Sequence, residues 1–323
     1  MKKSTRNILI VSLVLILVGG VLAGTGWALG GARSVALTSS GPVVNNPANL
    51  IQVDEHYSKI TSIDFDVDVM ELHLQPGEEF ALSGSYYDNN GALEITESNG
   101  KLSVQLNRNT YGTSILNFNW GLGFNGIGEY NSQTLTLTYP ANSKFTSVIL
   151  NSDYGDIEIS GLNANSLSLD MDAGSFIGEN IKVDSLDAYL DFGDFTINNL
   201  DVTNTATLEL NSGQLSSDDG GITVGELEAT LDLGDIDIDE LTVKNSGNLT
   251  LSAGALNINK VEANDLSIFA DMGSVEVKGK LTGTSIFEVR MGSCSLEMDQ
   301  SAERIAFEIV TDMGSIDING RDY

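Results

Sequence analysis

Apolar and polar residues alternate with a period of two through most of the chain after residue 50. Between residues 60 and 74, for example, Ile63, Phe65 and Val67 are separated by single aspartates. Such alternation is typical of a β-strand with one face buried. No stretch beyond residue 50 shows a convincing helical period, so the pattern predicts an all-β fold.

A glycine recurs every 19 to 22 residues through the second half of the chain, always between two of these alternating segments. The residue two positions after each glycine is apolar, as at Ile157, Phe195 and Ile236. A fixed period of this length indicates one unit stacked on copies of itself. The nine glycines are Gly155, Gly174, Gly193, Gly213, Gly234, Gly254, Gly273, Gly292 and Gly314.

The repeat predicts a right-handed parallel β-solenoid with coils of about 20 residues, in which each strand pairs with its copy about 4.8 Å away. The glycine is then expected at a corner that needs a positive φ or no side chain. The alternative is an antiparallel β-sandwich, which shows turn signals every 8–12 residues. A sandwich gives no reason for a phase-locked glycine, so the solenoid is favoured.

The first 32 residues read as a cytoplasmic tip followed by a membrane anchor. Lys2, Lys3 and Arg6 precede a stretch from Asn7 to Ala32 that carries no charge. Residues 8–30 are long and apolar enough to cross a bilayer as one helix, and the positive-inside rule places the N-terminus in the cytoplasm and the rest outside the cell. The alternative is a signal peptide cleaved after residues 28–30.

Three further segments follow the anchor. Residues 33–49 read as a polar linker, 50–145 as atypical N-terminal coils and a cap, and 146–323 as the glycine-phased repeats. The cap holds an uncharged insertion at residues 109–128. Its aromatic residues suggest either a cover for the open end of the solenoid or a binding or membrane-proximal contact, with a surface protein or glycan as the ligand. They are Tyr111, Phe118, Trp120 and Phe124.

The part of the chain beyond residue 53 carries 12 basic and 45 acidic residues, a net charge of −33. Such a field repels nucleic acid and anionic lipid headgroups, so we expect no nucleic-acid partner. The charge either keeps an exposed rod soluble or attracts a divalent cation or a basic partner.

Aspartates gather next to the first corner glycines. Asp153, Asp172 and Asp191 lie two residues before a glycine, and Asp156 and Asp194 directly follow one. In a solenoid the first three align along one edge, where they either shape the turn or bind Ca²⁺ weakly between coils. The G-G-x-G-x-D pattern of Ca²⁺-binding repeats is absent from the sequence, so we expect no cofactor beyond weak Ca²⁺.

The sequence holds little that points to catalysis. His56 and His73 are the only histidines, and both precede the repeats. Asp271, Arg290 and Asp312 align on successive coils and resemble the acidic and basic groups of solenoid polysaccharide lyases, but Arg290 is better explained as neutralising its neighbours. The single cysteine, Cys294, stands at the apolar position of its coil. We therefore expect a protein without enzymatic activity.

The segments 154–159 (YGDIEI), 233–238 (LGDIDI) and 313–318 (MGSIDI), with the leading segment 135–140 (LTLTYP), resemble the bacterial putative-adhesin family. Its members are uncharacterised cell-surface β-solenoids with G-[DS]-I-x-I repeats, often behind an N-terminal membrane helix. The resemblance implies a surface adhesin or binding scaffold. Some relatives are encoded beside envelope-stress signalling systems, so the alternative is an accessory or sensor protein in cell-envelope stress regulation.

Overall fold

The computed structural model describes residue 19 and residues 34–38, 41–45, 50–87, 93–106, 114–119, 133–299 and 306–322. The chain forms two compact units. Within these described ranges, no helix is long and apolar enough to span a bilayer. The membrane span expected over residues 8–30 lies outside them, apart from Gly19.

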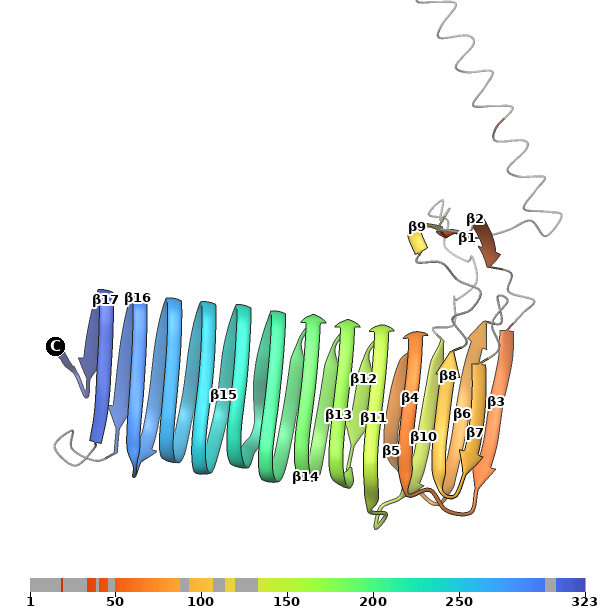
Figure 1. Cartoon of the computed structure of the whole chain (residues 1–323), viewed down its shortest axis with the longest axis horizontal. Helices are drawn as coiled ribbons and strands as arrows, with labels where there is room; N and C mark the ends of the chain where they lie inside the picture. The colour runs from red at the N-terminus through yellow and green to blue at the C-terminus, as the bar shows by residue number, and fades with distance from the viewer. Residues whose placement is uncertain are drawn as a thin grey trace, which may run out of the picture. The chain divides into compact units, whose positions relative to one another are not determined.

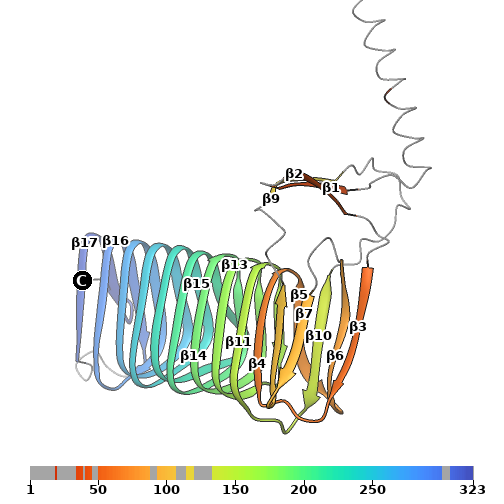
Figure 2. The same cartoon turned by 45° about the vertical axis from the view of Figure 1, so that its right-hand side comes forward.

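The larger unit is a β-solenoid built on one sheet of 15 strands, and Figures 1 and 2 show its coils side by side. Its N-terminal strands are β3 (Leu50–Tyr57), β4 (Ser62–Val69), β5 (Glu71–Gly77), β6 (Phe80–Tyr87), β7 (Leu93–Ser98), β8 (Lys101–Leu106) and β10 (Thr134–Pro140). The repeats supply β11 (Phe145–Tyr154), β12 (Ile157–Ser160), β13 (Asn163–Ala173), β14 (Phe176–Phe192), β15 (Phe195–Leu281), β16 (Thr284–Met298), β17 (Ala306–Ile318) and β18 (Arg321–Asp322).

Each coil consists of a strand before the glycine and a strand after it, and both pair in parallel with the next coil. Before the glycine, Leu150 of β11 pairs with Leu169 of β13. After the glycine, Ile157 of β12 pairs with Phe176 of β14, which pairs with Phe195 of β15. The parallel β-solenoid predicted from the period is confirmed, and the β-sandwich is not the fold.

The core is a set of apolar columns that run along the stack. Phe176 and Phe195 stack with ring centroids 4.6 Å apart. Further along the same column, Val275 pairs with Cys294, and Cys294 is 1% exposed. Each fully buried aliphatic or aromatic side chain contributes about 1.5–3 kcal/mol. Repetition of these columns supplies the core without a disulfide.

The corner glycines need backbone conformations that other residues avoid. Eight of them, from Gly155 to Gly292, have φ between 136° and 158°. A Cβ on Gly193 would overlap the carbonyl oxygen of Gly174, one coil earlier, and the same holds for Gly234 against Gly213. The glycines therefore lie directly against one another from coil to coil, which explains why the period is phase-locked.

The strands of the N-terminal coils do not stack in the order in which they occur along the chain. β4 and β5 form one coil with Met70 at its corner, and β11 stacks on β4. In the part of the chain between β5 and β11, β8 pairs in parallel with the other side of β4, and β10 pairs in parallel with β5. β6 then pairs with β10 in antiparallel fashion, and β3 extends the sheet beyond β6. Residues 107–133 thus connect β8 to β10, whereas the strands on which these two stack, β4 and β5, are connected by Met70 alone.

The smaller unit contains a three-stranded antiparallel sheet of β1 (Ser34–Thr38), β2 (Gly41–Asn45) and β9 (Ser114–Asn119). Val35 pairs with Val44 on one side and with Phe118 on the other. The segment 33–49, expected to be a polar linker, therefore holds two strands, of which β1 pairs with the uncharged insertion. Short runs rich in β-branched and apolar residues, SVALT and PVVN, are the sequence signal for these strands.

Candidate functional site

Three of the aspartates that precede the corner glycines, Asp191, Asp232 and Asp271, accept hydrogen bonds from the next coil. The residues that interrupt this row in the sequence supply the donors. Arg290 Nη1 lies 2.8 Å from Asp271 Oδ1, and Ser252 Oγ donates to Asp232 Oδ1 over 3.2 Å. Asn211 Nδ2 likewise donates to Asp191. Each interruption thus relieves the repulsion that stacked carboxylates about 4.8 Å apart would otherwise create.

The aspartates that follow the corner glycines connect coils through the backbone. Asp156 Oδ1 accepts a hydrogen bond of 2.8 Å from the amide of Ser175, directly after the next glycine. Asp194 accepts one of 3.1 Å from Gln214, and Asp235 one of 2.8 Å from Ala255. These carboxylates stabilise the corner of the following coil.

The hydrogen bonds favour a structural role for the predicted calcium ligands. Ca²⁺ needs six to eight oxygen ligands. No group of three or more histidine, cysteine, aspartate or glutamate side chains suited to a metal ion occurs in the part of the chain that the structure describes. Asp156, Asp191 and Asp194 already accept hydrogen bonds. Weak Ca²⁺ binding at Asp153 and Asp172 stays a prediction.

A row of exposed apolar side chains runs along the same corner, one residue before the glycines. Of the nine exposed large apolar side chains in the described ranges, six stand at this position. We call these six residues the apolar ridge: Tyr154 (60% exposed), Phe192 (64%), Leu233 (59%), Met272 (50%), Met291 (42%) and Met313 (67%). They lie outside the core, so the fold itself does not require them to be apolar.

The positions of the ridge are in register from coil to coil, with small residues at some of them. Tyr154 pairs with Ala173, which pairs with Phe192. Met272, Met291 and Met313 pair in the same way on three successive coils. The sequence analysis missed this row. The sequence signal for this row is the set of dipeptides YG, FG, LG and MG at the corners. A solvent-facing position that is repeatedly large and apolar needs a reason beyond the core.

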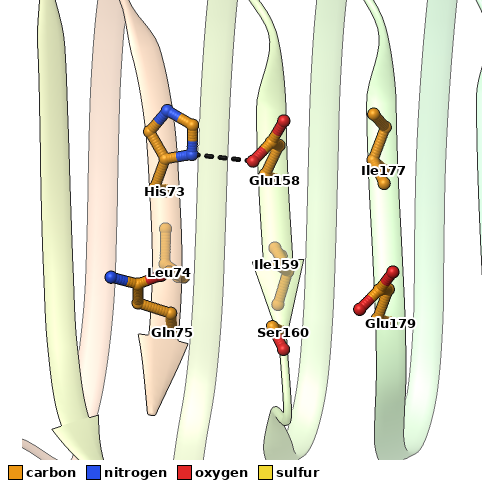
Figure 3. A pocket seen from close by; sticks show the side chains of 8 residues that line it. All are labelled: His73, Leu74, Gln75, Glu158, Ile159, Ser160, Ile177 and Glu179. Atoms are coloured by element: carbon orange, nitrogen blue, oxygen red, sulfur yellow. Dashed lines mark hydrogen bonds and ion pairs between the residues drawn. The ribbon is translucent and has the colours of Figure 1, made fainter. Parts of the chain in front are cut away.

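A shallow pocket lies on the outer face of the strands that follow the glycines (Figure 3). His73 Nδ1 and Glu158 Oε2 are 2.9 Å apart at one end, and Gln75, Ser160 and Glu179 line the other. Its volume is about 230 Å³. Ligand pockets commonly measure about 300–1,000 Å³. The Ser160 side chain lies away from His73 in Figure 3, so the pocket offers no activated nucleophile.

Arg290 of the lyase-like trio does not serve as the base. Arg290 Nε donates to Glu288 Oε1 over 3.0 Å, besides its contact with Asp271. The hydrogen bond to Glu288, followed by the negative charges of Asp271 and Glu288, raises the pKa of the Arg290 guanidinium above its ordinary value. Arg290 therefore stays protonated and cannot abstract a proton.

The aromatic residues of the insertion are only partly described. Phe118 lies in β9, where it pairs with Val35. Tyr111, Trp120 and Phe124 lie outside the described residues. A ligand contact at this insertion stays a prediction.

A family model described as Toastrack DUF4097 matches residues 60–220 and again 193–322. Among solved structures, a putative adhesin from Bacteroides fragilis is 14% identical, with 83% of this chain and 96% of its own aligned at a TM-score of 0.32. A putative adhesin from Parabacteroides merdae is 10% identical (84% and 97% aligned, TM-score 0.37). A third, named a putative lipid binding protein from Parabacteroides distasonis, is 14% identical (84% and 97%, TM-score 0.37). A search of curated proteins found no match.

Proposed function

Since this chain belongs to the Toastrack DUF4097 family, as the resemblance in its repeats implied, we propose that its solenoid is a binding scaffold at the cell surface and not an enzyme. The apolar ridge carries the proposal. Apolar side chains that are 42–67% exposed and aligned on one corner lower the solubility of the protein and add little to its core. Their alignment in register on one corner is explained by a partner that covers them.

Two observations support the absence of catalysis. The polar side chains around the ridge are engaged in hydrogen bonds between coils, as at Asp191, Asp235 and Asp271. The strongest cationic candidate, Arg290, is held protonated. Incubation of the protein with a panel of anionic polysaccharides is expected to produce no unsaturated chain ends, and their appearance would establish a lyase instead.

The proposed location is the outer surface of the cell membrane, with the N-terminus in the cytoplasm. It rests on the uncharged stretch from Asn7 to Ala32 behind Lys2, Lys3 and Arg6. Substitution of the exposed Asn259 by cysteine gives a labelling site, because the native Cys294 is buried. A membrane-impermeant maleimide is expected to label Asn259→Cys on intact cells. Labelling only after lysis would contradict this location.

The binding role is tested by adhesion. Cells that display the full chain are compared with cells that display the triple variant Phe192→Ser, Leu233→Ser, Met272→Ser, on surfaces coated with basic, neutral and acidic proteins and with glycans. Ser212 occupies the same position naturally, so the variant is expected to fold. We expect wild-type cells to adhere to at least one coating through the ridge. Equal adhesion of both strains to every coating would overturn the proposal.

A role in cell-envelope stress regulation is the second candidate, and the uncharged stretch at residues 7–32 favours it. A regulator that acts through its membrane helix loses its effect when residues 7–32 are replaced by a cleavable signal peptide. A scaffold released in this way still binds its ligand. Loss of an envelope-stress response in the replaced strain, with ligand binding retained, would favour regulation.

A further inference from the structure

We propose that the apolar ridge binds a cationic amphipathic helix, whose apolar face covers the ridge while its basic residues contact the flanking aspartates. This inference rests on the proposed binding role of the ridge and names the partner. Length, charge and spacing along the corner each support it.

The charge of the corners indicates that the partner is cationic. From two residues before each corner glycine to one residue after it, the nine corners carry nine aspartates and a single cation, Arg290. Asp156, Asp194 and Asp235 lie on one side of the ridge, and the row from Asp153 to Asp312 lies on the other. Neutral amides and hydroxyls of the next coil donate the hydrogen bonds to five of these carboxylates, so their negative charge remains: Asp156, Asp191, Asp194, Asp232 and Asp235. A partner that buries the ridge must bring positive charge beside it.

The spacing of the ridge fits a helix. Large and small residues alternate over the first six corners: Tyr154, Ala173, Phe192, Ser212, Leu233 and Ala253. Large side chains therefore recur every second coil, about 9.6 Å apart. One heptad of an α-helix rises about 10.5 Å, so apolar residues at heptad spacing can enter the gaps left by the alanines and the serine.

The length of the ridge sets the length of the partner. Eight coil-to-coil steps separate Tyr154 from Met313. At about 4.8 Å a step the ridge spans about 38 Å, which is the length of a helix of about 25 residues. The last three corners carry Met272, Met291 and Met313, flexible side chains that adapt to different partners.

The same charges disfavour the other occupants. A second copy of this chain would bring two rows of aspartates together, and like charges across an interface are costly. An anionic bilayer would meet the same repulsion. A cationic helix is the occupant that satisfies both the apolar and the acidic components of the corner.

The test measures the affinity of the full chain, held in zwitterionic lipid nanodiscs, for a synthetic helix of about 25 leucines and lysines with leucine at heptad spacing. Empty nanodiscs give the background. Control peptides carry the same residues in scrambled order, or glutamate in place of lysine. We expect saturable binding of the ordered cationic peptide alone, weakened as NaCl rises because the charges are screened.

Matched variants locate the site. Phe192→Ser and Leu233→Ser are each expected to weaken binding about tenfold, equal to about 1.4 kcal/mol. Asp232→Asn, which copies the natural Asn211, is expected to weaken binding and to lessen its salt dependence. Ile177→Ser is the control, because Ile177 is exposed (38%) but lies on the strand after the glycine.

The inference would be overturned if the cationic helix failed to bind, or if it bound and Phe192→Ser and Leu233→Ser left its affinity unchanged. If ridge-dependent adhesion persists in either case, the binding role stands and only the partner is wrong. Binding of the glutamate peptide or of anionic vesicles in place of the cationic helix would also exclude this partner, and self-association through the ridge in sedimentation would assign the surface to a second copy.

Discussion

Arg290 reaches back one coil to Asp271, with Nη1 2.8 Å from Oδ1, at the point where the row of corner aspartates is interrupted. Asn211 and Ser252 make the equivalent contacts to Asp191 and Asp232. The residues that interrupt the row of aspartates therefore have a structural role. Each donates a hydrogen bond to the carboxylate one coil earlier and so helps it to stack at the spacing of a parallel sheet.

Replacement of Arg290 by glutamine is expected to lower the free energy of unfolding only slightly, because the pair is exposed. Half of each side chain is open to solvent (56% and 53%). The loss is expected to shrink at high salt. Chemical denaturation at two salt concentrations measures it, and Arg290→Lys, which keeps the charge, is the control. A loss that does not depend on salt would mean that packing, and not charge, dominates at this corner.

Replacement of Gly234 by alanine is expected to cost about 3 kcal/mol or more, because φ is 139° and the new Cβ would overlap the Gly213 carbonyl oxygen. Gly221→Ala is the matched control, since its Cβ would lie 3.3 Å from the Cβ of Glu240 and 3.4 Å from its carbonyl oxygen, a tight contact without the overlap found at Gly234. Thermal unfolding followed by circular dichroism compares the two variants. Equal stability of both would show that the corners do not stack closely.

Ser152 is a buried hydroxyl among apolar neighbours. It is 2% exposed, pairs with Val67 and Met171, and its Oγ has no hydrogen-bond partner among the described residues. Ser152→Ala is therefore expected to raise the free energy of unfolding by about 1 kcal/mol.

The equally buried Ser217 provides the contrast, because its Oγ donates to the Gly220 carbonyl over 2.7 Å. When both variants are unfolded in a denaturant titration, Ser217→Ala is expected to be destabilising. If Ser152→Ala also destabilises the protein, the hydroxyl of Ser152 must have a partner such as a bound water.

Stability is expected to fall as the pH rises from about 9 to about 11, in part through Cys294. Burial raises the pKa of its thiol to about 11. In this window the unfolded chain loses the thiol proton while the folded chain keeps it, so the folded state binds more protons. Stability then declines by at most about 1.4 kcal/mol per pH unit for this group. Urea unfolding of wild type and Cys294→Val over this range isolates the contribution, and identical slopes would contradict it.

Much of the fold could be predicted from the sequence because the repeat leaves a direct mark on it. A glycine whose Cβ would strike the preceding glycine must recur once per coil, and Ile157, Phe176 and Phe195 must follow it at a fixed distance to fill one column. The chain path that stacks β8 on β4 and β10 on β5 leaves no such pattern in the sequence. The pairing of β1 with β9 joins segments almost 80 residues apart, and short alternating runs do not specify such partners.

The site was harder to predict for a physical reason. Aspartates beside glycines read equally well as turn formers or as calcium ligands, and only the bonds of Asp156 and Asp194 to the next coil separate these roles. The residue before each glycine could have revealed the ridge. Its exposure follows from the corner geometry, however, because strict alternation does not fix which way Phe192 or Leu233 points where the strand turns.

The most direct test of the central claim uses the methionine methyl groups. Met272, Met291 and Met313 belong to the ridge, whereas Met70, Met171 and Met298 are at most 7% exposed. In ¹³C-methyl NMR spectra of the full chain, a soluble paramagnetic agent is expected to broaden the three ridge signals, and the cationic helix is expected to shift them and protect them from that broadening. The three buried signals should change little. Ridge methyl groups that are shielded in the free protein, or unaffected by the helix while it binds elsewhere, would contradict the account.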